Sequence, residues 1–80
     1  MTKYTKDEIW LMDEMEFANI FQVNRYAIVT LDNNLIIEGR IQEIGVAANP
    51  NMNVHEHAPV SIKIVDESIS IQSIKEITVC

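Results

Sequence analysis

Apolar positions along this chain follow two different spacings, and the change falls near residue 25. Between Ile9 and Phe21 large apolar side chains recur at the spacing of a helix surface. From Tyr26 onward they alternate with polar residues, which is typical of half-buried strands. The pattern predicts a single mainly β domain, with one N-terminal helix over about residues 5–21 and a small barrel over about residues 25–80.

The predicted helix start is marked by Thr5-Lys6-Asp7-Glu8. A threonine followed three residues later by a glutamate forms a capping box, because each side chain accepts a hydrogen bond from the other residue's backbone amide. Tyr4 and Ile9 have the spacing of a hydrophobic staple across this cap. We therefore expect the helix to begin at Thr5.

This helix has more apolar surface than one contact needs, because its large side chains fall on three faces at about 100° per residue. One interpretation is that the surplus binds another subunit or a protein; the other is that Phe21 lies beyond the helix end and fills the core. Trp10, the single tryptophan, fits a core position or the centre of an interface equally well. The candidate interface residues are Trp10, Glu14, Phe17 and Phe21.

Strand patterning begins at Tyr26-Leu31 and is followed by Asp32-Asn33-Asn34, residue types that tolerate the backbone of a tight hairpin. A second strand runs to about Ile44 and is interrupted by Gly39, which is typical of a bulge or a sharp bend. Residues 45–59 contain both prolines and little regular pattern, so we expect a long loop or a distended hairpin.

Three further short strands are expected downstream of this loop. Val60-Ile64 and Ser68-Gln72 alternate apolar with polar residues, and Asp66-Glu67 is the expected turn between them. A single helical turn at Ser73-Glu76 then leads into a last strand at Ile77-Val79. The expected count is five strands.

A helix followed by five short, strongly bent strands resembles the Sm-like variety of the SH3-type small barrel. The first part of the family's first motif is similar to Gly39-Arg40-Ile41-Gln42-Glu43-Ile44 of this chain. Its second part is similar to Met52-Asn53-Val54, displaced along the chain by an insertion of four residues. The Ile74-Lys75-Glu76-Ile77 ending is similar to YolD-like proteins, and the helix before the barrel to the acidic Rho-inhibitor family Rof. These resemblances imply a regulator that acts by binding protein.

The Sm resemblance would also imply RNA binding, but the residues that serve it are missing. Where the family has an Arg-Gly pair, this chain reads Ile71-Gln72-Ser73. Twelve acidic against six basic residues give a net charge of −6, which opposes the phosphate contacts that supply much of RNA affinity. The missing motif and the negative charge therefore argue against nucleic acid as a partner.

Composition adds three expectations. Eighty residues form one marginally stable domain, and a lone Cys80 can form no internal disulfide, so self-association is the expected supplement. The free thiol and the lack of a long apolar run favour a soluble, cytoplasmic protein without a membrane partner. Thirteen isoleucines against three leucines fit the AT-rich genome of a low-GC bacterium or its phage.

Few residues suggest chemistry. His55 and His57 project to the same side if they lie in a strand, which makes them weak metal candidates, although two ligands do not make a site. The serines have no evident base, and two glycines cannot build a phosphate loop, so we expect neither catalysis nor a cofactor. The loop offers binding candidates of another kind: Asn51, Met52, Asn53, His55 and His57.

The hypothesis from sequence is a non-catalytic, acidic binding module that self-associates and regulates a protein partner through the helix and the 45–59 loop. The acidic residues along the helix suit a basic partner. A small-ligand or nucleotide-binding oligomer is the first alternative, and an RNA-binding Sm-like protein is the second.

Overall fold

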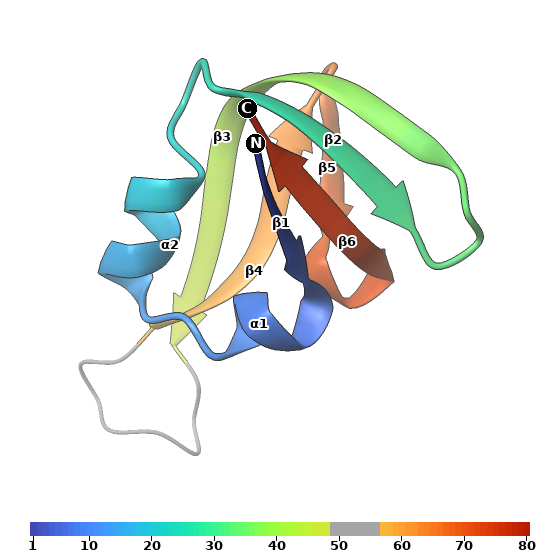
Figure 1. The fold of residues 1–80 in the computed structure, drawn as a ribbon. Coiled ribbons are helices and arrows are strands. Elements are labelled where there is room, and N and C mark those ends of the chain that lie inside the picture. Colours follow the sequence, from blue (N-terminus) through green and yellow to red (C-terminus); the bar gives the residue numbers. More distant parts are fainter. Residues whose placement is uncertain (49–56) are drawn as a thin grey trace.

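The protein is described by a computed structural model that covers residues 1–48 and 57–80. Within these ranges six strands and two short α-helices are present (Figure 1). In chain order the elements are β1 (Thr2–Thr5), α1 (Lys6–Trp10), α2 (Glu14–Ile20), β2 (Tyr26–Leu31), β3 (Ile36–Ala48), β4 (His57–Ile64), β5 (Glu67–Ser70), the 3-10 helix η1 (Ile71–Ser73) and β6 (Ile74–Val79).

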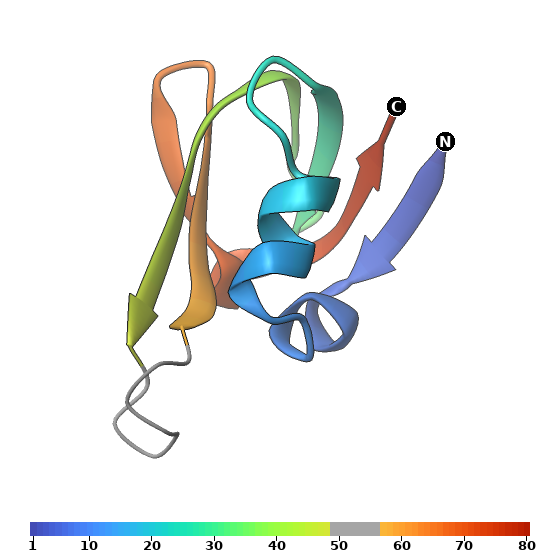
Figure 2. The ribbon, with the colours of Figure 1, turned by 90° about the vertical axis from the view of Figure 1, so that its left-hand side faces the viewer.

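The strands form one antiparallel sheet in the order β1-β6-β2-β3-β4-β5. Strands β2 to β5 follow each other as a meander, and β6 returns to pair with the other side of β2. The sheet is strongly curved (Figures 1 and 2), but it does not close, because β1 and β5 are its two edges. The mainly β class is confirmed, and the six antiparallel strands in one unclosed sheet agree only roughly with the expected five-stranded barrel.

The curvature centres on β3, which is shared by two halves of the sheet. Its first part, Ile36–Arg40, pairs with β2, and its second part, from Ile41 on, pairs with β4. Gly39 lies just before this change of partner. A Cβ atom at Gly39 would lie 3.1 Å from side-chain carbons of both Ile64 and Val65. The glycine therefore allows the β4-β5 hairpin to approach the bend closely.

The turn between β2 and β3 is where the sequence places it. The amide of Asn34 donates to the Leu31 carbonyl at 2.9 Å, and the amide of Leu31 donates to the Leu35 carbonyl at 2.8 Å. Asn34 has a φ of 68°, a left-handed value that asparagine tolerates better than most residues. The predicted tight hairpin at Asp32-Asn33-Asn34 is confirmed.

The single predicted helix over residues 5–21 is wrong, because the chain bends between Leu11 and Asp13. Thr5 caps α1 with the predicted capping box. Asp13 then caps a second helix by accepting from the Glu16 amide at 2.8 Å. One straight helix would spread its apolar residues over three faces, whereas the bend directs both Ile9 and Phe17 into the core.

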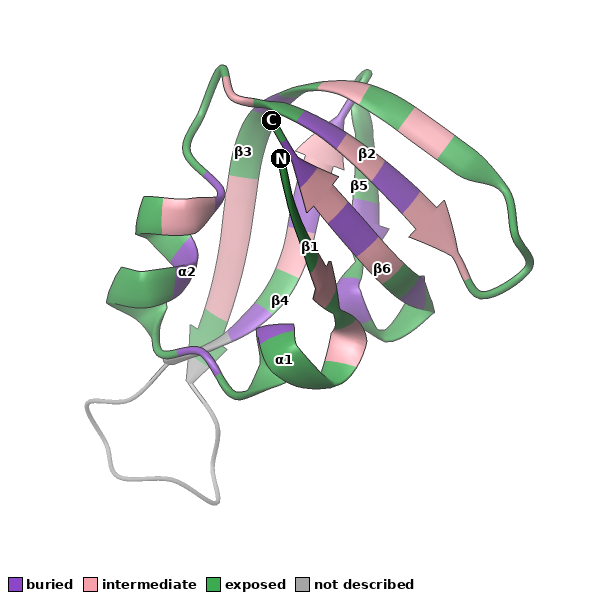
Figure 3. Ribbon diagram, in the orientation of Figure 1, coloured by how far each residue is buried: buried purple, intermediate pink, exposed green. Residues whose placement is uncertain are grey.

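The core lies between the two halves of the curved sheet and beneath the helices (Figure 3). Helix α1 contacts β1, β4, β6 and η1, and α2 contacts β4. Inward positions of the strands are mostly isoleucine and valine, which suit a pleated, close-packed surface. The buried apolar residues are Ile9, Met12, Phe17, Phe21, Ala27, Val29, Ile41, Ile62, Ile64, Ile69, Ile71, Ile74, Ile77 and Val79.

The loop predicted over residues 45–59 is corrected at both ends. Strand β3 continues to Ala48 and β4 begins at His57, and the two remain paired up to these residues. Of the two expectations for this region, a long loop or a distended hairpin, the hairpin therefore fits the paired residues of β3 and β4 better. A shift in register between Gly45 and Val46 accounts for the irregular apolar pattern that suggested a loop.

Other boundaries downstream also move. The helical turn occurs as η1 at Ile71–Ser73, so β6 begins at Ile74 rather than Ile77. The preceding hairpin turns at Val65 and Asp66, one residue earlier than expected. Strand β1 was not predicted at all.

Val65→Asn is expected to stabilise the protein by about 1 kcal/mol. Val65 and Asp66 have φ values of 53° and 60°, as in the mirror-image turns that suit two-residue hairpins. A β-branched residue is strained there, whereas asparagine tolerates this backbone. The gain is measurable as a higher urea midpoint with an unchanged slope.

The neighbouring contacts of this turn provide the control. Gln42 holds the turn to β3, because its amide donates to the Asp66 carboxylate at 3.0 Å and its carbonyl accepts from the Asp66 backbone amide at 2.7 Å. Gln42→Ala is therefore expected to destabilise the same hairpin. A loss of stability in Val65→Asn would show that the valine contacts at the β3 bend outweigh the backbone strain.

Candidate functional site

Three large apolar side chains lie exposed where α1 bends into α2. Trp10, Leu11 and Met15 are 46%, 86% and 74% exposed. They are neighbours along the chain on either side of the bend, and we call them the elbow surface. Scattered exposed apolar residues are ordinary, but three large ones on one short bend are typical of a contact surface.

The local fold explains why these residues face outward. Ile9 and Met12 turn into the core, so Trp10 and Leu11 between them must point away from it. The backbone of Leu11 closes α1 by donating to the Asp7 carbonyl at 3.2 Å. Met15 lies in the first turn of α2, on the side opposite the buried Phe17. The bend that completes the core therefore creates the elbow surface.

Trp10 is partly held in place by a basic neighbour. The Lys6 ammonium lies 5.8 Å from the centre of the indole ring, within the range of a cation–π contact. The same ammonium is 3.0 Å from the Asp32 carboxylate in the β2-β3 turn. Lys6 thus links α1 to the sheet and contacts the indole ring of Trp10.

The surroundings of the elbow surface are acidic. Residues 7–24 include five aspartates and glutamates and no lysine or arginine. Two of the five have structural roles: Glu8 accepts from the Thr5 amide at 3.0 Å, and Asp13 caps α2. The carboxylates of Asp7 and Glu16 are exposed beside the elbow surface. The local charge is therefore negative, and the nearby Lys6 ammonium is itself paired with Asp32.

The predicted interface is partly corrected. Phe17 and Phe21 have no exposed surface, and their ring centres lie 5.2 Å apart in the core. They therefore offer no contact to a partner, and the alternative that Phe21 fills the core is correct. Trp10 and Glu14 are exposed, as the hypothesis requires. Whether they contact a partner stays a prediction.

Leu11 and Met15 were not among the predicted interface residues. Both fall on the face of a continuous helix that would be the natural core face, so a straight helix hides their role. The sequence Asp13-Glu14-Met15-Glu16 contains the signal that could have revealed their exposure. An aspartate followed three residues later by a glutamate is typical of the start of a new helix. Placing a cap at Asp13 turns Leu11 and Met15 outward.

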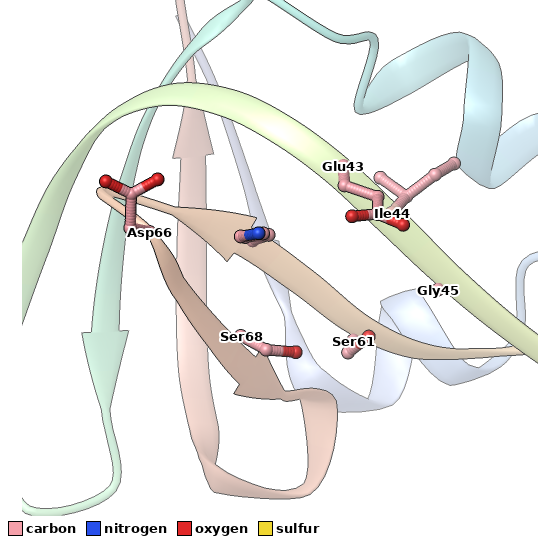
Figure 4. A pocket seen from close by; sticks show the side chains of 7 residues that line it. Glu43, Ile44, Gly45, Ser61, Asp66 and Ser68 are labelled. Atoms are coloured by element: carbon pink, nitrogen blue, oxygen red, sulfur yellow. The ribbon is translucent and has the colours of Figure 1, made fainter.

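A shallow polar cavity of about 310 Å³ lies on the outer face of β3, β4 and β5 (Figure 4). Glu43 is paired across from Lys63, and Gly45 from Ser61. A Cβ on Gly45 would collide with the Ser61 hydroxyl, so this glycine leaves room for the serine. Ser68 and Asp66 complete the rim. These groups can form hydrogen bonds to a small polar molecule.

The predicted loop candidates Asn51, Met52, Asn53 and His55 lie outside the described residues. His57 belongs to β4 through its backbone, which is paired with Ala48. Within residues 1–48 and 57–80, no group of three or more potential ligands is placed to hold a metal ion. In the same ranges, no helix is both long and apolar enough to cross a bilayer.

The structure therefore shows a small, mainly β domain whose bend between α1 and α2 carries three exposed large apolar side chains beside acidic residues. Comparisons with protein-family models, with curated proteins and with solved structures found no match.

Proposed function

We propose that this protein is a non-catalytic binding module, and that its elbow surface takes a protein segment carrying apolar and basic side chains. The observation that supports this most directly is the exposure of Trp10, Leu11 and Met15 on one bend. Tryptophan is among the residues that contribute most when buried at an interface. Trp10, whose ring contacts the Lys6 ammonium, is the proposed anchor.

The acidic surroundings determine the chemistry of the proposed partner. Five carboxylates within residues 7–24, with no cation in that range, attract a basic segment and repel an acidic one. Attraction of this kind raises the association rate and falls with added salt. A short amphipathic helix with leucine and lysine faces would satisfy both the apolar and the charged parts of the site.

We also propose that the open sheet is a variant of the SH3-type, Sm-like small barrel. The meander β2 to β5, the return of β6 to β2, the bend in β3 and the one-turn η1 before the last strand support this proposal. In this variant β1 occupies the outer edge of β6. A regulatory or inhibitory role in a bacterium or phage is part of the same hypothesis, as is a contribution of the loop between β3 and β4.

The cavity beside Glu43, Ser61 and Lys63 supports one alternative, the binding of a small polar ligand. Its mixture of an ammonium, carboxylates and hydroxyls would suit a molecule that carries both charges. RNA binding is the less favoured alternative, because the chain has a net charge of −6.

Replacing both Leu11 and Met15 by glutamate is expected to abolish partner binding and leave the fold intact. Both side chains are exposed, and glutamate is a good helix former. Because the chain has one tryptophan, a blue shift of Trp10 emission reports binding directly. We expect a leucine–lysine peptide helix to produce this shift in the wild type, and a leucine–glutamate peptide of the same length to produce none.

Leu35→Glu is the matched control, since Leu35 is an exposed leucine of the β2-β3 hairpin and not part of the elbow surface. Capture from bacterial lysate, with and without nuclease, extends the test to natural partners. Proteins retained by the wild type and by Leu35→Glu, but lost with the double variant, would support the proposal. No dependence on the elbow surface, or retention of nuclease-sensitive RNA alone, would overturn it.

A further inference from the structure

The outer face of the half-sheet β1-β6-β2-β3 is uncovered. No described element lies over it in either view (Figures 1 and 2), because both helices lie on the core side and at one end of the sheet. A sheet face that simply meets water carries mostly polar residues. Most outward positions of this face are polar, but Tyr26, Ile28 and Ile36 add apolar surface among them, and Ile36 is 64% exposed.

The strand register arranges the outward side chains in rows across the four strands. The central row runs Lys3, Thr78, Ile28, Glu38. A cation therefore stands at one end of the row and an anion at the other, with an isoleucine and a threonine between them. The row beside it places Glu76 near the middle, and Lys3 lies 3.5 Å from that carboxylate.

The charge of this face differs from that of the rest of the molecule. The chain has twelve acidic and six basic residues, yet the paired outward positions of these four strands hold two of each kind, Lys3, Arg40, Glu38 and Glu76, and one more cation, Lys75, is exposed at the bulge in β6. A second copy of a protein with net charge −6 would be repelled by most of its surface, the acidic elbow region above all. This nearly neutral, partly apolar face repels it least.

We propose that two copies of the chain associate face to face through this half-sheet, about a twofold axis that runs along the strands between β6 and β2. Such an axis exchanges left and right across the sheet. It therefore places Glu38 opposite Lys3 of the partner subunit, and Ile28 opposite Thr78 of the partner subunit. The interface is isologous, so the ion pair occurs twice. This inference is independent of the function proposed for the elbow surface.

The geometry of packed sheets is compatible with this pairing. Two aligned sheets pack roughly 10 Å apart, with their strands rotated by about 30°. The rotation displaces the ends of a four-strand row by only a few ångströms, which lysine and glutamate side chains can span. Tyr26 belongs to the same face, where the strand register places it diagonally across from Glu38. Desolvation on the sheet and the charge of Glu38 raise the pKa of the phenol, so the hydroxyl stays protonated near neutral pH.

A face four short strands wide is at the small end of specific interfaces, so the expected dimer is weak and reversible. Sedimentation equilibrium over micromolar to millimolar concentration should give a monomer–dimer equilibrium. Glu38→Lys and Lys3→Glu should each weaken dimerisation at least about tenfold, because each opposes like charges. The double variant, with both charges exchanged, should restore it. Circular dichroism of each variant checks that the monomer is folded.

The charge-exchanged double variant distinguishes a contact between two subunits from a role of Lys3 or Glu38 within one folded chain. Restored dimerisation in the double variant requires that Lys3 and Glu38 meet across the interface, since within one chain they lie at opposite ends of the row. The Leu11 and Met15 double variant should dimerise like the wild type. A strict monomer at millimolar concentration, a double variant that stays monomeric, or a dimer that depends on the elbow surface would each overturn the proposal.

Discussion

Phe17→Ala is expected to lower the free energy of unfolding by about 3 to 5 kcal/mol. The Phe17 side chain is fully buried, and its ring centre lies 5.2 Å from that of Phe21. Phe21 in turn contacts the ring of Tyr4 on β1 edge-to-face, with centres 5.7 Å apart. Removing Phe17 leaves a cavity at the point where α2 is fastened to the sheet, and the ring pair is lost with it.

This loss is large for a domain of eighty residues, whose total stability is roughly 4 to 12 kcal/mol. Urea unfolding followed by circular dichroism measures it. Met15→Ala is the matched control, because Met15 lies on the same helix but is 74% exposed, and its loss should stay below about 0.5 kcal/mol. A cost below about 1 kcal/mol for Phe17→Ala would contradict this prediction and would show that neighbouring side chains fill the space left by the ring.

The strands illustrate what the sequence could predict. Period-two alternation identifies β2 correctly, because its inward residues Ala27 and Val29 are buried and its outward neighbours are not. The turn after it follows from local chemistry at Asp32 to Asn34. Both signals act within a few residues, so neither needs knowledge of the rest of the fold.

The features that were missed depend on distant contacts. Strand β1 has four residues, and its pairing with β6 joins residues more than seventy positions apart, which no local pattern reveals. The predicted second strand ended too early, near Ile44. The pairing of β3 with β4 shifts in register after Gly45, so the apolar residues beyond that point do not continue the same alternation. The sheet remains open because β1 takes the edge of β6, a consequence of the same distant pairing.

The candidate site was missed for a related reason. The sequence correctly indicated surplus apolar surface before Tyr26, but assigned it with the geometry of one straight helix. Asp13 caps a second helix, and this changes which apolar residues remain exposed. Phe17 and Phe21 fill the core, whereas Leu11 and Met15 lie on the surface. The bend at Asp13 therefore changes which of the apolar residues around it are buried and which are exposed.

The two proposed contact surfaces have opposite electrostatic requirements. The elbow surface lies in the most acidic stretch of the chain, so it suits a basic partner and disfavours a second copy. The paired outward positions of the half-sheet face hold equal numbers of acidic and basic residues, so this face suits a second copy. A dimer built on this face leaves both elbow surfaces free. It would therefore bind a partner with two equivalent sites, which increases avidity for a repeated or surface-bound target.

Arg25→Ala is expected to cost about 2 to 3 kcal/mol. The half-buried Arg25 side chain joins three parts of the chain. Its Nη1 donates to the Ile20 carbonyl at 2.8 Å, and its Nε donates to the Cys80 carbonyl at 3.0 Å. The first bond satisfies a carbonyl at the end of α2, where a positive charge also suits the helix dipole. The second fastens the residue after β6.

Arg25→Lys separates charge from geometry. One ammonium cannot reproduce two donors held in a planar group, so we expect the lysine variant to fall between the alanine variant and the wild type in urea unfolding. Arg40→Ala is the control, because Arg40 is exposed and donates to the Asn24 carbonyl at 2.9 Å; its cost should stay below about 1 kcal/mol. Wild-type stability in Arg25→Lys would mean that the charge at the end of α2 is sufficient and that the bond to Cys80 contributes little.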